Sequence, residues 1–390
     1  MYRGVNYFNY LNIIKEMLVM GISGCLCAEL LGGIEEGSAI EIKTSCDTLV
    51  GKLVGNITGN VIQLMKPNNT IINICCKDIC YIRKLPILPL AYVAIRDSNN
   101  GNTVDVINAN TDTVINTITV GRAPNSIAIT SDGTKAYVVN NLDHTVSVID
   151  TLSNSVISVV YVSQNPLGIA ITPDNAKAYV ANQAENTLSV IDVSSDIVIG
   201  TISINSPNAI AITPDGTRGY VTNPLDDMVT VIDISTDTII DTITAGDGIG
   251  DNPNAIAITP DGSKAYVTNS NDDTVSVIDL STNTVINTFS VGDSPHAVAI
   301  TPDGTKAYVV NGGSSNVSVI DTVSDMVIAV IIVGTSPHSV AITPNGAKGY
   351  VPRSSTASVM AFDVVDNSVF DNIIVGTDPA GLAIGLVPVL

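Results

Sequence analysis

One repeat of about 42 residues, a length typical of propeller blades, occurs seven times in the carboxy-terminal three quarters of this 390-residue chain. Each copy holds four short runs in which apolar and polar residues alternate, with polar turns between the runs. Such alternation is typical of β-strands, and four strands in a period of this length form one blade. The sequence therefore predicts an all-β fold, a seven-bladed β-propeller over residues 91–390. The units begin at Ala91, Ala136, Ala178, Gly219, Ala265, Ala307 and Gly349.

The repeat units do not coincide with whole blades at the two ends of the propeller sequence. The first unit begins at a second strand, 91–95, and the chain ends with the run 379–384, which matches a first strand. We therefore expect the last segment to complete the blade that begins at Ala91. Such closure pairs the two ends of a propeller and removes the exposed edges that an open row of sheets would leave.

Three motifs recur in the units and carry a family resemblance. They are Tyr-Val-Thr-Asn at 220–223 and 266–269, Val-Ser-Val-Ile-Asp at 146–150, 275–279 and 317–321, and Thr-Pro-Asp-Gly at 213–216, 259–262 and 301–304. With them, the repeat resembles the YVTN family of β-propellers. Members of that family are bacterial and archaeal surface or secreted proteins, many with no known enzymatic activity. The resemblance covers all seven units and implies a binding or structural function.

Residues that recur from unit to unit have a structural explanation. Pro-Asp-Gly fits a tight hairpin turn, because proline fixes φ and glycine accepts a positive φ. The recurring tyrosines, from Tyr92 to Tyr350, lie where a large ring can pack between adjacent sheets. Six basic residues share one position just after this turn, on the face that we call the bottom: Lys135, Lys177, Arg218, Lys264, Lys306 and Lys348.

Residues 39–85 follow a different pattern, with five alternating runs separated by short polar turns. This pattern predicts a small five-stranded β-barrel. The runs 51–64 and 71–82 resemble Sm-like barrels, including small ones associated with the spore coats of Gram-positive bacteria, and such barrels often form rings. The proline-punctuated residues 86–90 are expected to be a short, stiff linker to the propeller.

The first 38 residues are predicted to form a helical segment, with an amphipathic helix over Tyr7–Met20. An alternative rests on Ile22-Ser23-Gly24-Cys25, which resembles the lipobox of bacterial lipoproteins, where the cysteine is acylated after cleavage. Lys15 and Glu16 border an apolar stretch of only eight residues, 17–24, which is shorter than most signal cores. We therefore favour the helix over lipoprotein anchoring at Cys25.

All six cysteines lie in the first 80 residues: Cys25, Cys27, Cys46, Cys75, Cys76 and Cys80. Their spacing does not match paired zinc ligands, which argues against a structural zinc site. If the protein matures in an oxidising compartment, we expect disulfides within or between chains, so cross-linking is their candidate function. The alternative is that they are reduced, buried and packed as small hydrophobic residues.

The net charge of −20 belongs to the carboxy-terminal part, because residues beyond 85 include nine Lys or Arg and thirty Asp or Glu. An acidic field of this kind repels nucleic acid and anionic membranes, so we expect neither as a partner. The chain contains no apolar run of about 18 residues, the length that a membrane-spanning helix needs.

A ligand site is expected at the mouth of the propeller channel, on the face that we call the top. The residues that follow each loop proline form a ring there: Asn125, Leu167, Asn208, Asn254, His296, His338 and Ala380. The asparagines and histidines of this ring are the candidate ligand-binding residues. Two histidines without a nearby carboxylate make a poor metal site, and no cofactor motif is present, so we expect neither a metal nor a cofactor.

Three further arginines, Arg96, Arg122 and Arg353, fall in top-face loops where the first and last units meet. They are added to the candidate ligand-binding residues, because guanidinium groups bind carboxylates and phosphates well. The favoured alternative is that they neutralise nearby aspartates such as Asp97 and Asp378. The longest loop between units, 246–252, is expected to be a flexible surface loop, because Asp247 and Asp251 lack the spacing of a calcium loop.

Enzyme motifs do not stand out. The propeller part has one glutamate, Glu185, and no Ser-His-Asp order or phosphate-binding loop. We therefore expect a non-enzymatic bacterial protein of the cell surface or spore envelope, with a displayed propeller and an amino-terminal module that anchors or oligomerises. Its partners would be proteins or copies of itself, with a carbohydrate or a small anion as further ligands. The alternative is a ligand-binding or hydrolytic propeller that acts through its top-face channel.

Overall fold

The computed structural model describes residues 39–44, 48–53, 61–65, 71–75, 79–96 and 102–389, and the chain divides into two compact units after Pro86. The expected helix at 7–20 and the lipobox-like residues 22–25 lie outside the described residues. Within the described part of the chain, no helix has the length and apolar character needed to cross a membrane.

The first unit contains the five strands that the alternating runs predict. They are β1 (Ala39–Thr44), β2 (Thr48–Leu53), β3 (Val61–Met65), β4 (Ile71–Cys75) and β5 (Ile79–Lys84). They pair antiparallel in the order β4-β3-β2-β1-β5. Ile40 and Ile42 are fully buried together with Leu64, as expected for alternate residues that face a core.

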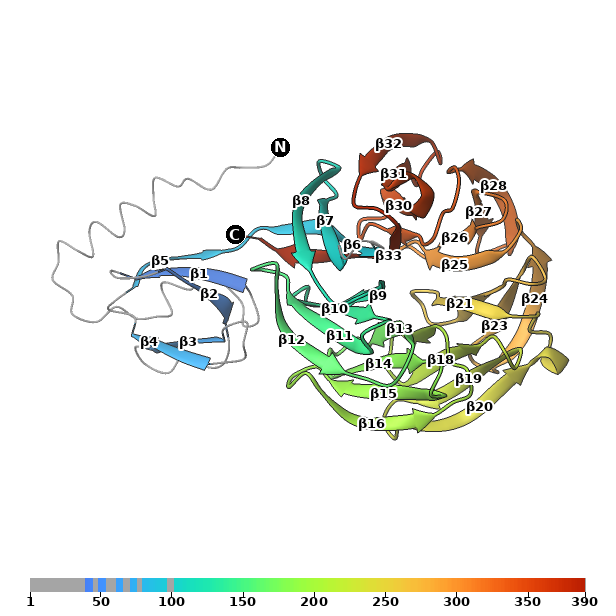
Figure 1. The fold of residues 1–390 in the computed structure, drawn as a ribbon, viewed down its shortest axis with the longest axis horizontal. Helices are drawn as coiled ribbons and strands as arrows, with labels where there is room; N and C mark the ends of the chain where they lie inside the picture. Colours follow the sequence, from blue (N-terminus) through green and yellow to red (C-terminus); the bar gives the residue numbers. More distant parts are fainter. Residues whose placement is uncertain are drawn as a thin grey trace. The chain divides into compact units, whose positions relative to one another are not determined.

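The second unit is a seven-bladed β-propeller, which confirms the predicted fold class. Seven four-stranded antiparallel sheets surround a central channel, with one strand of each sheet at the centre and another at the perimeter (Figure 1). We number these sheets as blades: blade 1 is β33-β6-β7-β8, blade 2 is β9-β12, and blades 3 to 7 follow in chain order up to β29-β32.

Each blade uses four strands at fixed repeat positions. The innermost are β33 (Pro379–Pro388), β9 (Pro124–Ile129), β13 (Pro166–Ile171), β17 (Ile210–Ile212), β21 (Pro253–Ile258), β25 (Pro295–Ile300) and β29 (Ala341–Ile342). The second are β6 (Ile87–Arg96), β10 (Lys135–Asn140), β14 (Lys177–Asn182), β18 (Arg218–Asn223), β22 (Lys264–Asn269), β26 (Lys306–Asn311) and β30 (Lys348–Arg353). The third are β7 (Asn102–Asn108), β11 (Thr145–Asp150), β15 (Thr187–Asp192), β19 (Met228–Asp233), β23 (Thr274–Asp279), β27 (Asn316–Asp321) and β31 (Ser358–Asp363). The outermost are β8 (Thr113–Thr119), β12 (Ser155–Tyr161), β16 (Ile197–Ser203), β20 (Thr238–Thr244), β24 (Thr284–Ser290), β28 (Met326–Ile332) and β32 (Val369–Ile374).

Blade 1 closes the ring as predicted, because the carboxy-terminal strand β33 pairs with β6. The proposed linker at 86–90 needs correction. Residues 87–90 are the first part of β6 and pair with residues 385–388 of β33, so the propeller begins at Ile87. Apolar residues explain the difference: Leu90 is fully buried, and the two extended segments satisfy each other's backbone groups.

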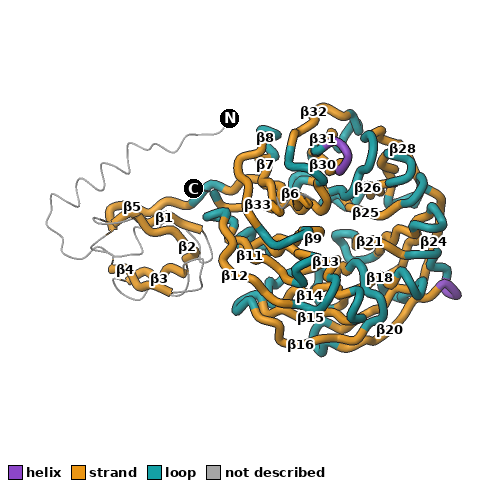
Figure 2. The backbone as a smooth tube through the Cα atoms, viewed as in Figure 1, coloured by secondary structure: helices purple, strands orange, loops and turns teal. Residues whose placement is uncertain are grey.

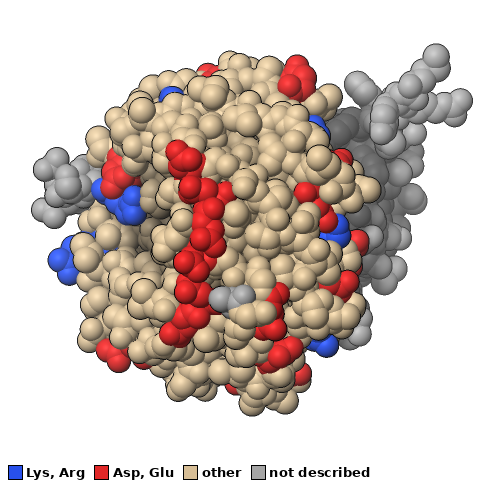
Figure 3. Space-filling view, turned by 90° about the vertical axis from the view of Figure 1, so that its right-hand side faces the viewer, with Lys and Arg blue, Asp and Glu red and all other residues tan. Residues whose placement is uncertain are grey.

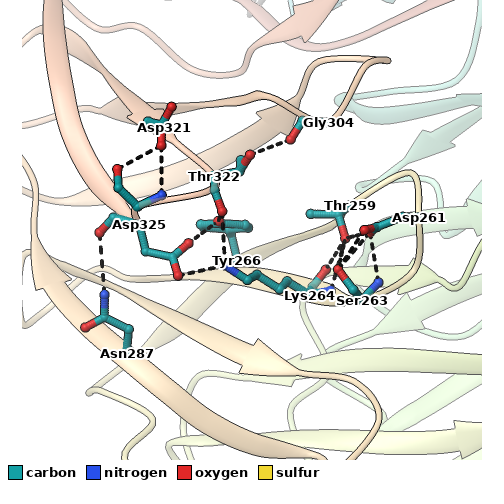
Figure 4. A network of polar contacts seen from close by, with 11 residues as sticks. Thr259, Asp261, Ser263, Lys264, Tyr266, Asn287, Gly304, Asp321, Thr322 and Asp325 are labelled. Atoms are coloured by element: carbon teal, nitrogen blue, oxygen red, sulfur yellow. Dashed lines mark hydrogen bonds and ion pairs between the residues drawn. The ribbon is translucent and has the colours of Figure 1, made fainter.

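The recurring tyrosines are fully buried between blades, and their hydroxyl groups bind the next blade. In blade 5, the Tyr266 hydroxyl donates to the Asp325 carboxylate of blade 6 (Figure 4). Lys264 Nζ lies 2.8 Å from the same carboxylate and 3.0 Å from the carbonyl oxygen of Thr322. Burial raises the pKa of Tyr266 far above its usual value, and the hydrogen bond to Asp325 adds to the increase. We call this tyrosine, lysine and aspartate arrangement the latch.

The latch recurs around the bottom face with defined variations. Its lysine and aspartate form an ion pair at four of the seven blade junctions: Lys135–Asp196, Lys177–Asp237, Lys264–Asp325 and Lys348–Asp112. At the junction of blades 1 and 2, Leu90 takes the place of the lysine, and the Tyr92 hydroxyl donates to Asn154. The shared position of the basic residues is therefore a structural feature of the repeat.

The loop 246–252 lies at the surface, as expected, since Gly246, Asp247, Gly248 and Asp251 are exposed. Ala245–Asp247 forms a 3₁₀ helix, and Ser354–Thr356 forms another (Figure 2). Ile249 is buried among apolar residues of blades 4 and 5, and the carbonyl oxygen of Gly248 accepts hydrogen bonds from Ser276 and Thr288. One apolar residue of this surface loop therefore reaches the core, and one of its backbone carbonyl groups has hydroxyl partners.

Candidate functional site

The top end of the channel holds a cavity of about 430 Å³, which is formed by residues at and next to the starts of the innermost strands. The structure brings five of the sequence-predicted ligand-binding residues together in its lining: Asn125, Asn208, Asn254, His296 and His338. Leu167 also lines it, as do Ser126 and Ser339, which were not among the predicted residues. Each of these two serines directly follows a ring residue, and this position in the sequence could have predicted that they line the cavity.

A shared turn directs the ring side chains into the cavity. The residue before each loop proline has a positive φ, between 44° at Ser206 and 57° at Asn252. Such a residue reverses the chain abruptly, and the proline then starts the innermost strand. The residue after the proline can therefore differ from blade to blade while the backbone stays the same.

Two histidines from adjacent blades meet in this cavity. The ring centroids of His296 and His338 lie 5.8 Å apart, with the rings edge to face. Burial lowers the pKa of His338 to about 3, and the charges of Arg96 and His296 contribute further. His338 is therefore neutral at physiological pH, when it can donate one hydrogen bond and accept another.

A hydrogen bond to the backbone fixes the tautomer of His296. Its Nδ1 lies 3.1 Å from the carbonyl oxygen of Ser294, which can only accept, so Nδ1 carries the proton. In the neutral ring, Nε2 is then left with a free lone pair. Gly312 leaves room for this ring position, because a Cβ atom there would lie 2.6 Å from His296 Cε1.

The asparagines of the ring are held by neighbouring groups. Asn208 Nδ2 donates to the carbonyl oxygen of Asn254 at 2.9 Å and to its side-chain Oδ1 at 3.0 Å. Asn125 Oδ1 accepts from Arg96 Nη1 at 3.3 Å. Among the described residues, the Nδ2 groups of Asn125 and Asn254 have no hydrogen-bond partner, so both can donate to a ligand.

The cavity differs in charge from the rest of the propeller. No Asp or Glu contributes to its described lining. Elsewhere, acidic side chains form a band down the face that Figure 3 shows. In a chain with a net charge of −20, an anionic ligand in this opening thus meets no carboxylate of the described lining.

The three arginines have separate partners. Arg96 makes an ion pair with Asp378 at 3.4 Å, and Arg122 makes one with Asp143 at 2.5 Å. Arg353 is buried, and its guanidinium donates to the carbonyl oxygen of Val333 and to side chains of the same blade. Only Arg96 contacts a residue of the cavity lining, so the structure does not unite the three in one anion site.

Two other predictions concern a metal site and the cysteines. No three His, Cys, Asp or Glu side chains come close enough to hold a metal within the described residues. Cys75 and Cys80 belong to β4 and β5, but the side chains of all six cysteines lie outside those that the structure describes.

A family model of lactonases with a seven-bladed β-propeller matches this chain over residues 103–285 and 205–326. Together the two matches span 103–326, which is more than half of the chain. The chain belongs to this lactonase family. This membership overturns our expectation of a non-enzymatic display or structural protein, and it favours the hydrolytic alternative. The expectation was wrong because the repeat motifs report on the scaffold, whereas a catalytic site uses residues that differ between blades.

Solved structures show the same fold as this lactonase-family propeller. Hydrazine synthase of Kuenenia stuttgartiensis is 23% identical with a TM-score of 0.61, and the match covers 67% of this chain and 90% of that one. A functionally unknown protein from Desulfotomaculum acetoxidans is 19% identical with a TM-score of 0.66, and the match covers 75% and 98%. A candidate 6-phosphogluconolactonase from Bacteroides fragilis is 16% identical with a TM-score of 0.65, covering 76% and 98%. None of the curated proteins that were compared matches the chain.

Proposed function

We propose that this propeller hydrolyses a small cyclic ester in the top-face cavity. The observation that carries the proposal is the pair of histidines at its mouth, with His296 oriented by Ser294 and His338 held neutral by burial. Membership of the lactonase family supports the same reaction class. A cavity volume of about 430 Å³ is large enough for a small-molecule ligand such as a lactone.

In the proposed reaction, His296 is the general base. Its Nε2 takes a proton from a water molecule while the water oxygen bonds to the ester carbonyl carbon. The amide groups of Asn125 and Asn254 donate to the oxyanion that forms on the carbonyl oxygen. The ring C–O bond then breaks, and the proton on His296 passes to the leaving alkoxide, so the product is a hydroxy acid.

His338 and Arg96 have supporting functions in this scheme. His338, which is neutral, contributes hydrogen bonds to the ester or the water without adding a charge. Arg96 donates a hydrogen bond to the side-chain oxygen of Asn125. The amide nitrogen of Asn125 therefore points away from Arg96. Arg96 is therefore a positioning residue.

The test is hydrolysis of simple γ- and δ-lactones, followed by pH-stat titration of the acid released. His296→Gln should lower the enzymatic rate by about 100-fold or more, whereas His144→Gln, which alters the histidine outside the cavity lining, should retain it. If the purified protein opens no lactone faster than buffer does, or if His296→Gln retains full activity, the proposal is wrong.

Two finer family likenesses accompany this proposal. The repeat motifs support membership of the YVTN group among propellers, and the strand order β4-β3-β2-β1-β5 supports an Sm-like first unit. Because Sm-like barrels form rings, the second likeness predicts oligomers of the full chain. Light scattering of the full chain under reducing conditions tests it, and a monomer would contradict it.

A further inference from the structure

A second cavity, of about 490 Å³, lies between the outer parts of blades 1 and 2, whose outermost strands β8 and β12 are neighbours (Figure 1). We call it the open groove. Val159 and Tyr161 of β12 are 50% and 79% exposed and form its apolar side. The groove is lined by Thr119, Val120, Gly121, Asp143, Thr145, Ser147, Val156, Val159 and Tyr161.

The equivalent place between blades 4 and 5 is occupied by the chain itself, and we call it the filled groove. Eight residues, 245–252, connect β20 to β21, whereas only four, 120–123, connect β8 to β9. The extra residues of the longer connection bring Gly248 against Val285. Val285 has the same repeat position as Val156 of the open groove, because each pairs with the isoleucine of a Val-Ser-Val-Ile-Asp motif.

The filled groove shows which chemistry this position binds. The carbonyl oxygen of Gly248 accepts from Ser276 Oγ at 3.4 Å and from Thr288 Oγ1 at 3.3 Å. The Asp247 carboxylate accepts from the backbone nitrogen and the hydroxyl of Thr244, both at 2.9 Å. A bound segment therefore presents an acidic side chain, a peptide carbonyl and a glycine that can lie flat on a valine.

The open groove keeps most of these binding groups. Thr119, Ser147 and Val156 occupy the positions of Thr244, Ser276 and Val285. Val159 replaces Thr288, which removes one hydroxyl group and adds apolar surface, and the ring of Tyr161 extends that surface.

Charge at the rim also favours an acidic ligand. Arg122, which follows Gly121 of the groove, stands where the filled groove has Asp251. Its Nε and backbone nitrogen bind Asp143, but its side chain is 61% exposed, and its two terminal nitrogens have no partner among the described residues. These nitrogens can bind a carboxylate in the bidentate manner of arginine.

We infer that the open groove binds a short peptide segment of a partner protein, with an acidic residue followed by glycine. The carboxylate binds at Thr119 and Arg122, the glycine carbonyl accepts from the Ser147 hydroxyl, and the next apolar side chain lies on Val159 and Tyr161. Asp247 and Gly248 of the filled groove are thus an internal copy of the first two ligand residues, whereas Ile249, the residue after them, enters the core there. This inference is independent of the proposed hydrolysis, because it concerns a different cavity.

The experiment uses the full chain and a synthetic peptide with the sequence of residues 244–251, acetylated and amidated at its ends. Isothermal titration should show one saturable site with a Kd of about 0.1–1 mM. The double variant Val159→Lys/Tyr161→Ala should weaken binding at least tenfold. Both positions are exposed, so the fold should be retained, with an unchanged circular dichroism spectrum.

A matched control comes from blade 6, where Val330 and Ile332 occupy the same repeat positions and are also exposed. Val330→Lys/Ile332→Ala should leave peptide binding unchanged, and replacing the peptide's first aspartate by asparagine should weaken it about threefold. Absence of binding at about 2 mM peptide would overturn the inference. Equal weakening by both double variants, or no weakening by the blade 2 variant, would do the same.

Discussion

On the bottom face, Tyr137 and Tyr266 have the same repeat position and donate to the same kind of partner, an aspartate of the next blade. On the top face, the residue after the loop proline is Asn254 in blade 5 and His296 in blade 6. The latch joins neighbouring blades, and because the blade junctions are alike, the same contacts recur at several of them. In the proposed reaction the cavity holds one ligand, which meets each blade from a different side, and its lining residues differ accordingly.

The largest expected effect concerns the latch. Asp325→Ala leaves Lys264 and the Tyr266 hydroxyl without their acceptor, and removal of one partner from a largely buried ion pair costs about 3 kcal/mol of stability. Asn154→Ala, at the junction without a lysine, removes only the Tyr92 hydrogen bond and should cost about 1 kcal/mol. Asp325 and Asn154 both have a positive φ, so the backbone strain that alanine introduces is similar in the two variants. Chemical denaturation measures the difference, and equal losses would show that the latch charge contributes nothing.

The second effect concerns the cavity and should separate activity from stability. His296→Gln removes the proposed base and should lower kcat by about 100-fold or more, while the free energy of unfolding changes by less than about 1 kcal/mol. Asp325→Ala should give the converse result, with reduced stability and unchanged kcat at a temperature where it remains folded. Steady-state kinetics and denaturation of both variants test whether the two faces are independent.

The third prediction concerns the pH dependence of stability. Burial lowers the pKa of His338 to about 3, whereas an unfolded histidine titrates near 6.5. Between these values the unfolded chain binds a proton that the folded chain does not, so stability falls as pH decreases. From pH 7 to pH 5 this one group should remove about 2 kcal/mol. The free energy of unfolding of His338→Asn should therefore fall by about 2 kcal/mol less than that of the unaltered protein between pH 7 and pH 5. Denaturation at both pH values measures this difference. An identical loss in both proteins would contradict the burial of His338.

Repetition explains how far the sequence could predict this structure. Seven copies of one pattern define the blades, the closure by β33 and the ring at the channel mouth, because each inference is supported several times. The latch was missed, although a signal was present: Lys135 and Asp196 lie 61 residues apart, as do Lys264 and Asp325. The properties of the histidines were not predictable, because the tautomer of His296 depends on a backbone carbonyl and the pKa of His338 depends on burial.

The smallest expected effect separates the two main causes of the lowered pKa of His338. Burial lowers its pKa most, and the charge of Arg96 comes second. Arg96→Gln removes that charge and should raise the pKa of His338 by less than about one unit, because the burial remains. The same variant releases Asn125, so kcat should fall while the pKa changes little. Proton NMR titration of the His338 ring, with His144→Gln as the control, measures the pKa. A return to a value near 6.5 would mean that charge, and not burial, keeps this side of the cavity neutral.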